Sequence, residues 1–277
     1  MPRKKSKIQE FKRFLKRNMT REWAAHFTYQ VVSFIVAVAL VVGVATYAVN
    51  KTYEERDLKF TDDFTLTAQS GSYNTETNSL DSIKTAVENG VKSVEFDLRQ
   101  SFDKTLFLSN EIVVSETNCT KLEDVFEYLK DKSVLIYIEV KETRTLSSLY
   151  QMILKYKLID RVLLTGISLG DVDEVKKDCP DIPYYLNYMP SRIKIYFDDY
   201  QEKLLETLWE SGAIGINCNY KYACEKLSKV LHENGFKLCV SGVEKDRDIK
   251  RILVAKPNNI ITRQPESVQK IIYNWYK

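Results

Sequence analysis

The sequence predicts an α/β protein in which a closed (β/α)8 barrel follows one N-terminal transmembrane helix. Residues 31–49 carry no charge. From residue 64 onward, short β-branched or aromatic runs alternate with longer amphipathic ones, as in a parallel sheet with crossover helices. The alternation extends over roughly 215 residues, which suits an eight-fold barrel. An open doubly wound sheet is the alternative, but no Gly-rich phosphate loop follows the first strand.

The uncharged stretch, "VVSFIVAVALVVGVATYAV", would extend about 28 Å as a helix, enough to span a bilayer core. Residues 1–30 hold nine Lys/Arg against Glu10 and Glu22, so the positive-inside rule places the N-terminus in the cytoplasm. A cleaved signal peptide is the alternative, but the leader is long and no A-x-A site follows. We expect a single-pass plasma-membrane protein with a cytoplasmic leader (1–30), a transmembrane helix (31–49), a juxtamembrane linker (50–63) and an extracytoplasmic barrel (64–277).

The leader and the remainder differ in charge. In "IQEFKRFLKR", Ile8, Phe11 and Leu15 share one helical face among basic residues, as in a helix that lies on an anionic leaflet. An unstructured basic leader that only fixes topology is an equal alternative. Residues 31–277 contain 32 basic and 36 acidic residues, and this net negative charge argues against nucleic-acid binding.

Five cysteines form no C-x-x-C pair, and the chain has only two histidines. A zinc site is therefore not expected. We expect buried thiols that pack as small apolar groups, although a disulfide between Cys218 and Cys224 is the nearest pairing in sequence.

The predicted strands are rich in β-branched and aromatic residues. They are residues 64–68, 92–98, 105–109, 134–140, 161–167, 182–188, 213–218, 237–243 and 259–262. Seven amphipathic helices are predicted between them, at 79–90, 121–131, 146–157, 169–178, 200–212, 223–235 and 247–256. Gly90, Gly212 and Gly235 end three of these patterns, as helix C-caps do.

Charged side chains gather where two predicted strands end. Glu95 and Asp97 stand at i and i+2 in "KSVEFDL", so both carboxylates project from one side of the strand. Glu139 and Lys141 repeat this spacing in "VLIYIEVKE". In a barrel, functional groups lie at the C-terminal ends of the strands. The alternative is that these residues are rim charges paired across the barrel.

These residues stand within a longer pattern. The segments "SLDSIKTAVENGVKSVEFDLRQSFDKTLFLSNE", "IEVKE", "LHENGFKLCVSGV" and "NNIITRQPESVQKII" resemble the glycerophosphodiester phosphodiesterase family, over roughly residues 64–272. The resemblance implies a TIM-barrel fold. It also implies that Glu95, Asp97 and Glu139, from the E-x-D and E-x-K motifs, bind Mg²⁺ or Ca²⁺. Lys141 would then contact phosphate.

Other family motifs are altered. Gln69 and Ser109 stand where H-R-G and H-D supply the two family histidines, and Thr77 stands where P-E-N-T-L has its glutamate. Arg263 replaces the acid of T-D-x-P. Since one histidine is thought to assist attack and the other to protonate the leaving group, the resemblance implies a catalytically impaired member.

Two functions therefore stay open. One is a membrane-anchored protein that binds the glycerophosphoryl groups of lipids or wall polymers. The other is an active metal-dependent phosphodiesterase in which Lys141, Glu111 or a metal-bound water replaces the histidines. Arg263 would contact the ligand phosphate together with Lys141 and Gln69, or would instead neutralise the acids and displace the metal.

Overall fold

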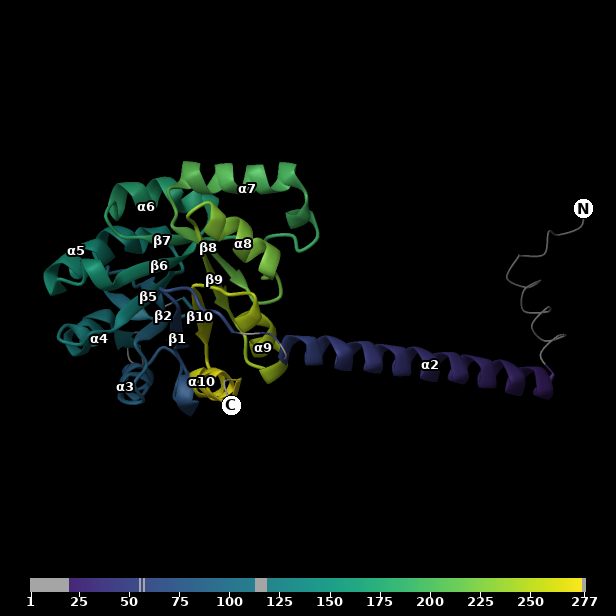
Figure 1. Cartoon of the computed structure of the whole chain (residues 1–277). Helices are drawn as coiled ribbons and strands as arrows, with labels where there is room; N and C mark the ends of the chain where they lie inside the picture. The colour runs from purple at the N-terminus through teal and green to yellow at the C-terminus, as the bar shows by residue number, and fades with distance from the viewer. Residues whose placement is uncertain (1–19, 55, 57, 113–118, 276–277) are drawn as a thin grey trace, which may run out of the picture. The chain divides into compact units, whose positions relative to one another are not determined.

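The computed structural model describes residues 20–54, 56, 58–112 and 119–275. The chain divides into two compact units, with the boundary after residue 55. The first contains one long helix, α2 (Arg21–Glu54), which Figure 1 shows as a single rod. Its segment Arg21–Ala48 is long and apolar enough to cross a membrane, a test that a signal sequence near the N-terminus also passes. The predicted interfacial helix around Ile8–Leu15 lies outside the described residues.

The second unit is a closed barrel of eight parallel strands, which confirms the predicted fold class. Strand β1 pairs with β2 on one side and with β10 on the other, and this second pairing closes the sheet. The strands follow one another around the barrel in chain order. They are β1 (Thr65–Gln69), β2 (Ser93–Gln100), β5 (Leu135–Val140), β6 (Val162–Ile167), β7 (Tyr184–Asn187), β8 (Gly215–Asn219), β9 (Lys237–Ser241) and β10 (Asn259–Thr262).

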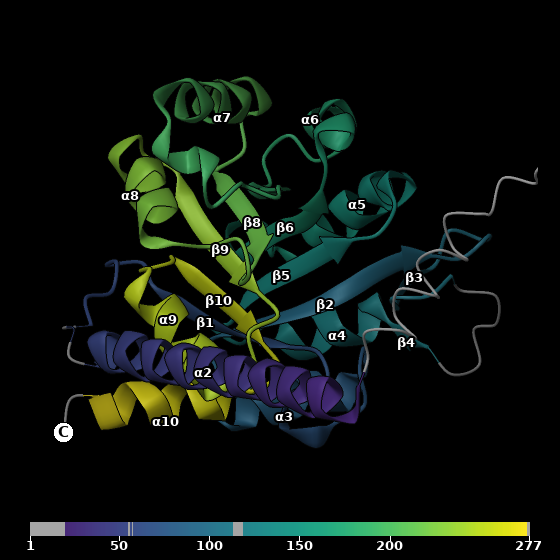
Figure 2. The same cartoon turned by 90° about the vertical axis from the view of Figure 1, so that its right-hand side faces the viewer.

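Helices cover the outside of the barrel, as Figures 1 and 2 show. They are α3 (Leu80–Glu88), α4 (Leu122–Leu129), α5 (Leu146–Tyr156), α6 (Val172–Asp178), α7 (Asp198–Ser211), α8 (Glu225–Glu233), α9 (Asp246–Val254) and α10 (Pro265–Trp275). The first seven match the seven predicted helical patterns. Gly212 ends α7 with a φ of 74°, the left-handed conformation that glycine adopts without steric cost.

Two features differ from the sequence prediction. The run 105–109 forms a strand, β3 (Leu106–Leu108), but it pairs antiparallel with β2 and with β4 (Thr120–Lys121) and lies outside the barrel. Helix α10, which begins at Pro265, is not among the helices predicted from the sequence. Proline suits the first turn of a helix, where its missing N–H leaves no hydrogen bond unmade.

Successive side chains of each strand point alternately toward the outer helices and into the barrel, so the barrel has two apolar layers. Val94, Phe96 and Leu98 of β2 are at most 1% exposed and face the helices. Inside the barrel, Tyr137, Tyr185, Cys239 and Ile261 form a buried cluster. This cluster fills the barrel interior, so a ligand is expected only at its end. Three of the cysteines, Cys179, Cys218 and Cys239, are buried free thiols.

Candidate functional site

The two acids of β2 project to the barrel interior at its C-terminal end. The strand has period two, so Ser93, Glu95 and Asp97 face inward while Phe96 packs outward. Glu95 is 2% exposed, whereas Asp97 lies nearer the rim. A strand with two inward carboxylates needs a cation or a proton to balance them.

Strand β5 brings the third acid beside the other two. Asp97 pairs directly with Glu139 in the parallel register of β2 and β5. One carboxylate oxygen from each of Glu95, Asp97 and Glu139 lies within 4.8 Å of the others. The three side chains that the E-x-D and E-x-K motifs single out therefore converge, and we call them the acidic triad.

Lys141 joins the acidic triad rather than facing outward. Its Nζ lies 2.8 Å from Asp97 Oδ1 and 2.6 Å from Glu139 Oε1. The Lys141 backbone N–H donates to Leu98 O at 3.2 Å, which holds the end of β5 against β2. The ammonium thus bridges carboxylates from two neighbouring strands.

Asn78 holds Asp97 in place, a role that the sequence analysis missed. Its Nδ2 donates to Asp97 Oδ2 at 2.8 Å, and its Oδ1 accepts from the Asp97 backbone N–H at 3.0 Å. Asn78 adopts a φ of 57°, a conformation that Asn tolerates better than most residues. Its backbone N–H donates to Ser70 Oγ. The segment that corresponds to the family's P-E-N-T-L motif contains this asparagine. Its separation of 19 residues from Asp97 in the sequence gave no indication that the two side chains are in contact.

Burial and charge shift two pKa values at the site. Burial, together with the negative charges of Asp97 and Glu139, raises the pKa of Glu95 well above its usual value. Burial alone would lower the pKa of Lys141, but hydrogen bonds and Coulomb attraction to Asp97 and Glu139 outweigh it and raise this pKa. Lys141 is therefore a protonated cation at neutral pH.

The two positions assigned to the family histidines lie along the same edge of β2, opposite the edge that pairs with β5. Gln69 pairs with Glu95 in the β1–β2 register. Ser109 donates its backbone N–H to Asp97 O at 3.0 Å. The Ser109 hydroxyl donates to Glu111 O at 2.7 Å and accepts from the Glu111 N–H at 3.1 Å. Neither an amide nor this hydroxyl titrates near neutral pH.

Arg263 directly follows β10 and is exposed. Ala68 pairs with Thr262, so Gln69 and Arg263 leave neighbouring strands side by side. Among the described residues, the ion pairs of Asp97 and Glu139 are made by Lys141 and not by Arg263. Lys141 thus neutralises Asp97 and Glu139, which was one of the two roles expected of Arg263.

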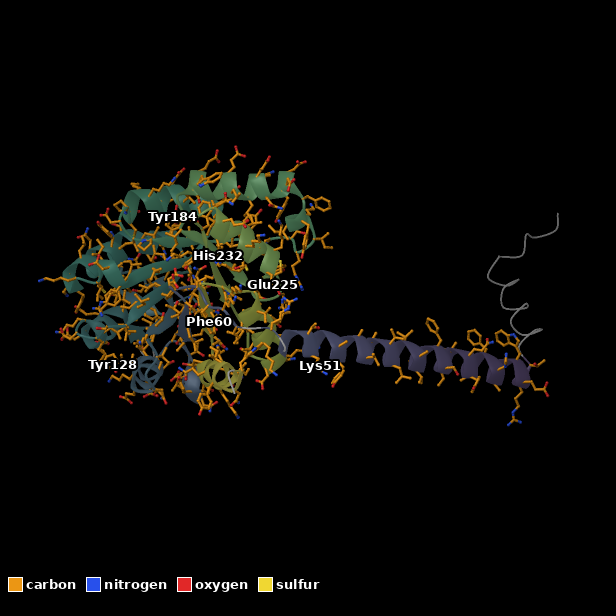
Figure 3. The ribbon with its side chains drawn as sticks, viewed as in Figure 1. Lys51, Phe60, Tyr128, Tyr184, Glu225 and His232 are labelled. Carbon is orange, nitrogen blue, oxygen red and sulfur yellow. The ribbon has the colours of Figure 1, made fainter. Side chains whose placement is uncertain are left out.

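The barrel contains one histidine, His232, and it does not lie at this end. His26 is part of α2. His232, labelled in Figure 3, lies on α8 with its Nε2 2.8 Å from Asn258 Oδ1. Asn258 directly precedes β10, so this contact is at the opposite end of the barrel from the acidic triad. His232 is partly buried and hydrogen-bonded.

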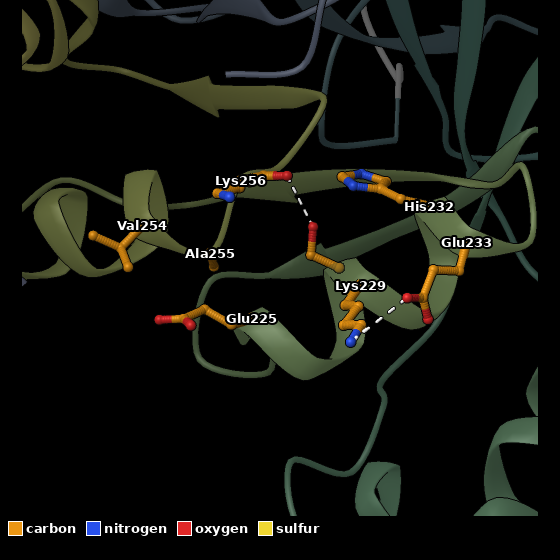
Figure 4. Close-up of a pocket in the computed structure, with 8 residues that line it drawn as sticks. Glu225, Lys229, His232, Glu233, Val254, Ala255 and Lys256 are labelled. Carbon is orange, nitrogen blue, oxygen red and sulfur yellow. Dashed lines mark hydrogen bonds and ion pairs between the residues drawn. The ribbon is translucent and has the colours of Figure 1, made fainter. Parts of the chain in front are cut away.

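A separate hollow of about 310 Å³ lies outside the barrel, between α8 and the connection from α9 to β10 (Figure 4). Ser228 Oγ donates to Lys256 O at 2.9 Å, and Lys229 Nζ lies 3.6 Å from Glu233 Oε1. Its charged side chains are of both signs, and two of them, Lys229 and Glu233, form an ion pair. It does not adjoin the acidic triad.

The acidic triad fits a hard divalent cation. Its ligand atoms are all carboxylate oxygens, which Mg²⁺ and Ca²⁺ prefer, and they lie close enough together to contact one ion. One oxygen each of Asp97 and Glu139 is already engaged by Lys141.

No family model matches the chain. A glycerophosphodiester phosphodiesterase of Caldanaerobacter subterraneus subsp. tengcongensis is 22% identical over 237 residues, covering 73% of this chain and 94% of that protein. A putative glycerophosphoryl diester phosphodiesterase of Silicibacter pomeroyi is similar in structure, with a TM-score of 0.66 and 13% identity over 80% of this chain and 97% of that one.

Two further solved structures share the fold. The glycerophosphodiester phosphodiesterase of Thermotoga maritima has a TM-score of 0.61 and 20% identity, and covers 75% of this chain and 98% of that one. An Oleispira antarctica phosphodiesterase, solved with the product sn-glycerol-3-phosphate, has a TM-score of 0.63 and 15% identity over 76% of this chain and 96% of that one. These similarities confirm the predicted resemblance to the glycerophosphodiester phosphodiesterase family and its barrel fold.

Proposed function

We propose that this chain, which resembles the glycerophosphodiester phosphodiesterases, is a membrane-anchored barrel that binds a divalent cation and a glycerophosphoryl group, with hydrolysis weak or lost. The observation that carries this proposal is the convergence of Glu95, Asp97 and Glu139 within 4.8 Å of one another. The one histidine of the barrel, His232, does not lie at that end. The chain thus has ligands for a cation without the acid and base groups of the family.

The proposed site has a cation half and a phosphate half. The acidic triad would hold Mg²⁺ or Ca²⁺, which when bound supplies a positive charge that neutralises phosphate oxygens. Lys141, Gln69 and Arg263 would contact the phosphate, because an ammonium, an amide and a guanidinium all donate hydrogen bonds to anionic oxygen. The neighbouring strand ends of β1 and β10 place Gln69 and Arg263 together.

The groups at the two altered positions support the proposed loss of hydrolysis. General acid and base groups contribute about 10²–10⁴-fold each when their pKa lies near the working pH. Gln69 cannot exchange a proton there, and Ser109 uses its hydroxyl to hold Glu111. Such a protein binds its cation and its phosphate ligand but lacks the groups that transfer protons during hydrolysis.

The test is to incubate the purified chain with glycerophosphocholine and Mg²⁺ or Ca²⁺ and to measure glycerol phosphate. Binding of glycerol phosphate without turnover is the expected result. Release that requires metal, is abolished in Glu95→Gln and persists in the matched surface variant Glu88→Gln would establish the alternative, an active phosphodiesterase. The acidic triad favours that alternative too, because a bound cation lowers the pKa of water.

The proposed ligands are phospholipid headgroups or polyglycerol-phosphate wall polymers, both of which lie close to a bilayer. We propose that α2 spans the plasma membrane once, with the N-terminus in the cytoplasm and the barrel outside, because basic residues precede its apolar segment. Protease added to intact spheroplasts should then digest the barrel. A protected barrel would contradict this topology, and a mature protein that begins after α2 would identify a signal sequence.

A further inference from the structure

Lys141 occupies the position between two of the three cation ligands. Its ammonium contacts Asp97 Oδ1 and Glu139 Oε1 at 2.8 and 2.6 Å. The three side chains are 18%, 14% and 29% exposed, in the order Lys141, Asp97, Glu139. This ion pair is thus partly shielded from water, where a charge interacts more strongly than at an open surface.

The sequence spacing produces this contact. Glu139 and Lys141 lie at i and i+2, so both side chains leave β5 on its inward side. Asp97 stands opposite Glu139 in the register. The Lys141 ammonium therefore reaches both carboxylates. The other oxygen of Asp97 is bonded to Asn78, so Asp97 has little freedom to turn toward a different cation.

An ammonium and a divalent cation compete for these oxygens, because the two positive charges repel each other at such short range. Mg²⁺ binds carboxylate oxygen at about 2.0–2.1 Å and Ca²⁺ at about 2.3–2.6 Å. Lys141 already lies at hydrogen-bond distance from the same atoms, and a second positive ion there would be repelled by it. Binding of the metal at these oxygens therefore favours departure of the ammonium.

We propose that Lys141 is a built-in counter-cation that a divalent metal must displace, and that the displaced ammonium then binds the phosphate of the ligand. This inference rests on the proposed function and deepens it. It couples the two halves of the site, because a phosphate that draws Lys141 away opens the acidic triad to the metal. By linkage, metal and phosphate each raise the affinity for the other by the same factor.

The first experiment measures metal binding alone. The full-length chain in detergent micelles is titrated with Mg²⁺ or Ca²⁺ by calorimetry, as wild type, Lys141→Met and Lys203→Met. Lys203 is an exposed lysine of α7, and this variant controls for the loss of one positive charge. We expect Lys141→Met to bind metal at least about tenfold more tightly than wild type and Lys203→Met to match wild type. Equal or weaker binding in Lys141→Met overturns the proposal.

The second experiment measures coupling, with inorganic phosphate as the probe. In wild type, saturating metal should raise phosphate affinity at least about fivefold, and in Lys141→Met this factor should fall toward one. If the factor persists in Lys141→Met, the metal itself binds the phosphate and the displaced lysine has no role. If neither protein binds metal but both bind phosphate, the displacement is refuted while phosphate binding in the proposed function stands.

A third variant keeps the test decisive if Lys141→Met fails to fold. Lys141→Arg retains the positive charge, and a guanidinium holds carboxylates two oxygens at a time. We expect it to resist displacement and to bind metal several-fold more weakly than wild type. Metal affinity equal to wild type in Lys141→Arg overturns the proposal.

Discussion

The carboxamide of Asn78 forms two hydrogen bonds with Asp97, one to the carboxylate and one from the backbone N–H. Asn78 lies in the loop between β1 and α3, and the next residue, Ser79, caps that helix by accepting from the Ser82 N–H at 3.0 Å. The loop is therefore fixed at both ends, by Ser70 and by the helix cap. Asp97 owes its orientation to this loop as well as to its own strand.

Replacing Asn78 should weaken metal binding without removing a ligand. In Asn78→Ala, Asp97 Oδ2 loses its donor, and side chains that orient metal ligands typically contribute about 10–100-fold to affinity. Calorimetric titration with Mg²⁺ or Ca²⁺ should show a loss in this range, whereas Asn89→Ala, at the exposed end of α3, should bind as wild type does. Unchanged affinity in Asn78→Ala would show that β2 alone orients Asp97.

Glu95→Gln should stabilise the metal-free protein while it abolishes metal binding. The folded-state pKa of Glu95 is raised, so ionisation of Glu95 costs more in the folded than in the unfolded chain. Stability is greatest below the unfolded pKa of about 4.3 and falls as pH rises through the folded pKa. At pH 7 we expect Glu95→Gln to gain about 1–3 kcal/mol in free energy of unfolding, and at pH 4 to gain much less.

Urea unfolding of the metal-free protein at both pH values, followed by the fluorescence of Trp209 and Trp275, measures this gain. Glu88→Gln on the exposed side of α3 is the matched variant and should change stability little at either pH. A Glu95→Gln protein that is less stable than wild type at pH 7 would show that Lys141 fully compensates the three charges.

Asp63 should make stability depend on pH in the opposite sense. Burial raises its pKa, but hydrogen bonds from Lys237 and Asn258 outweigh this and lower the pKa to about 2. A depressed folded pKa gives stability that is present above the unfolded pKa of about 3.9 and is lost as pH falls toward 2. Because Asp63 is 43% exposed, solvent screening reduces the contribution to about 1 kcal/mol.

Asp63→Asn should therefore be about 1 kcal/mol less stable than wild type at pH 7 and nearly equal to it at pH 2.5. Denaturant unfolding at the two pH values provides the comparison. Asp62→Asn, at the exposed neighbouring residue, should match wild type at both. A deficit in Asp63→Asn that is the same at both pH values would mean that the hydrogen bonds, rather than the charge, stabilise this end of the barrel.

The sequence predicted the barrel better than it predicted the site. Each barrel strand has a two-residue period and each helix an amphipathic pattern, and both are local properties that short windows reveal. The E-x-D and E-x-K spacings likewise place Glu95, Asp97 and Glu139 on inward faces. The register between β2 and β5 then brings them together, and register depends on packing across the whole sheet rather than on either strand alone.

The contacts of Asn78 and Lys141 could not be predicted in the same way. Asn78 reaches Asp97 across 19 residues of sequence, through a loop whose path depends on a left-handed φ and on Ser70. Neutralisation of the acids was one of two roles left open for Arg263, whereas in the structure Lys141 makes the ion pairs with Asp97 and Glu139. A long flexible side chain can face a ligand or its own neighbours, and spacing alone does not distinguish the two.

Gly166 permits the close approach of β6 to the end of β5, and its replacement should disturb Glu139. The residue has a φ of 82°, and a Cβ there would lie 2.4 Å from Val140 O and 3.2 Å from Glu139 Cγ. The backbone of Val140 cannot move aside as easily as the end of a flexible side chain can. Gly166→Ala should therefore lower the free energy of unfolding by about 2 kcal/mol or more. Gly170→Ala is the control, because its Cβ would meet nothing closer than Ser168 Oγ at 3.8 Å.

If the strands separate to admit the methyl group, Glu139 moves away from Asp97, and metal affinity should fall in Gly166→Ala but not in Gly170→Ala. Lost stability with unchanged metal affinity would show instead that the strain is absorbed in the connection after β6.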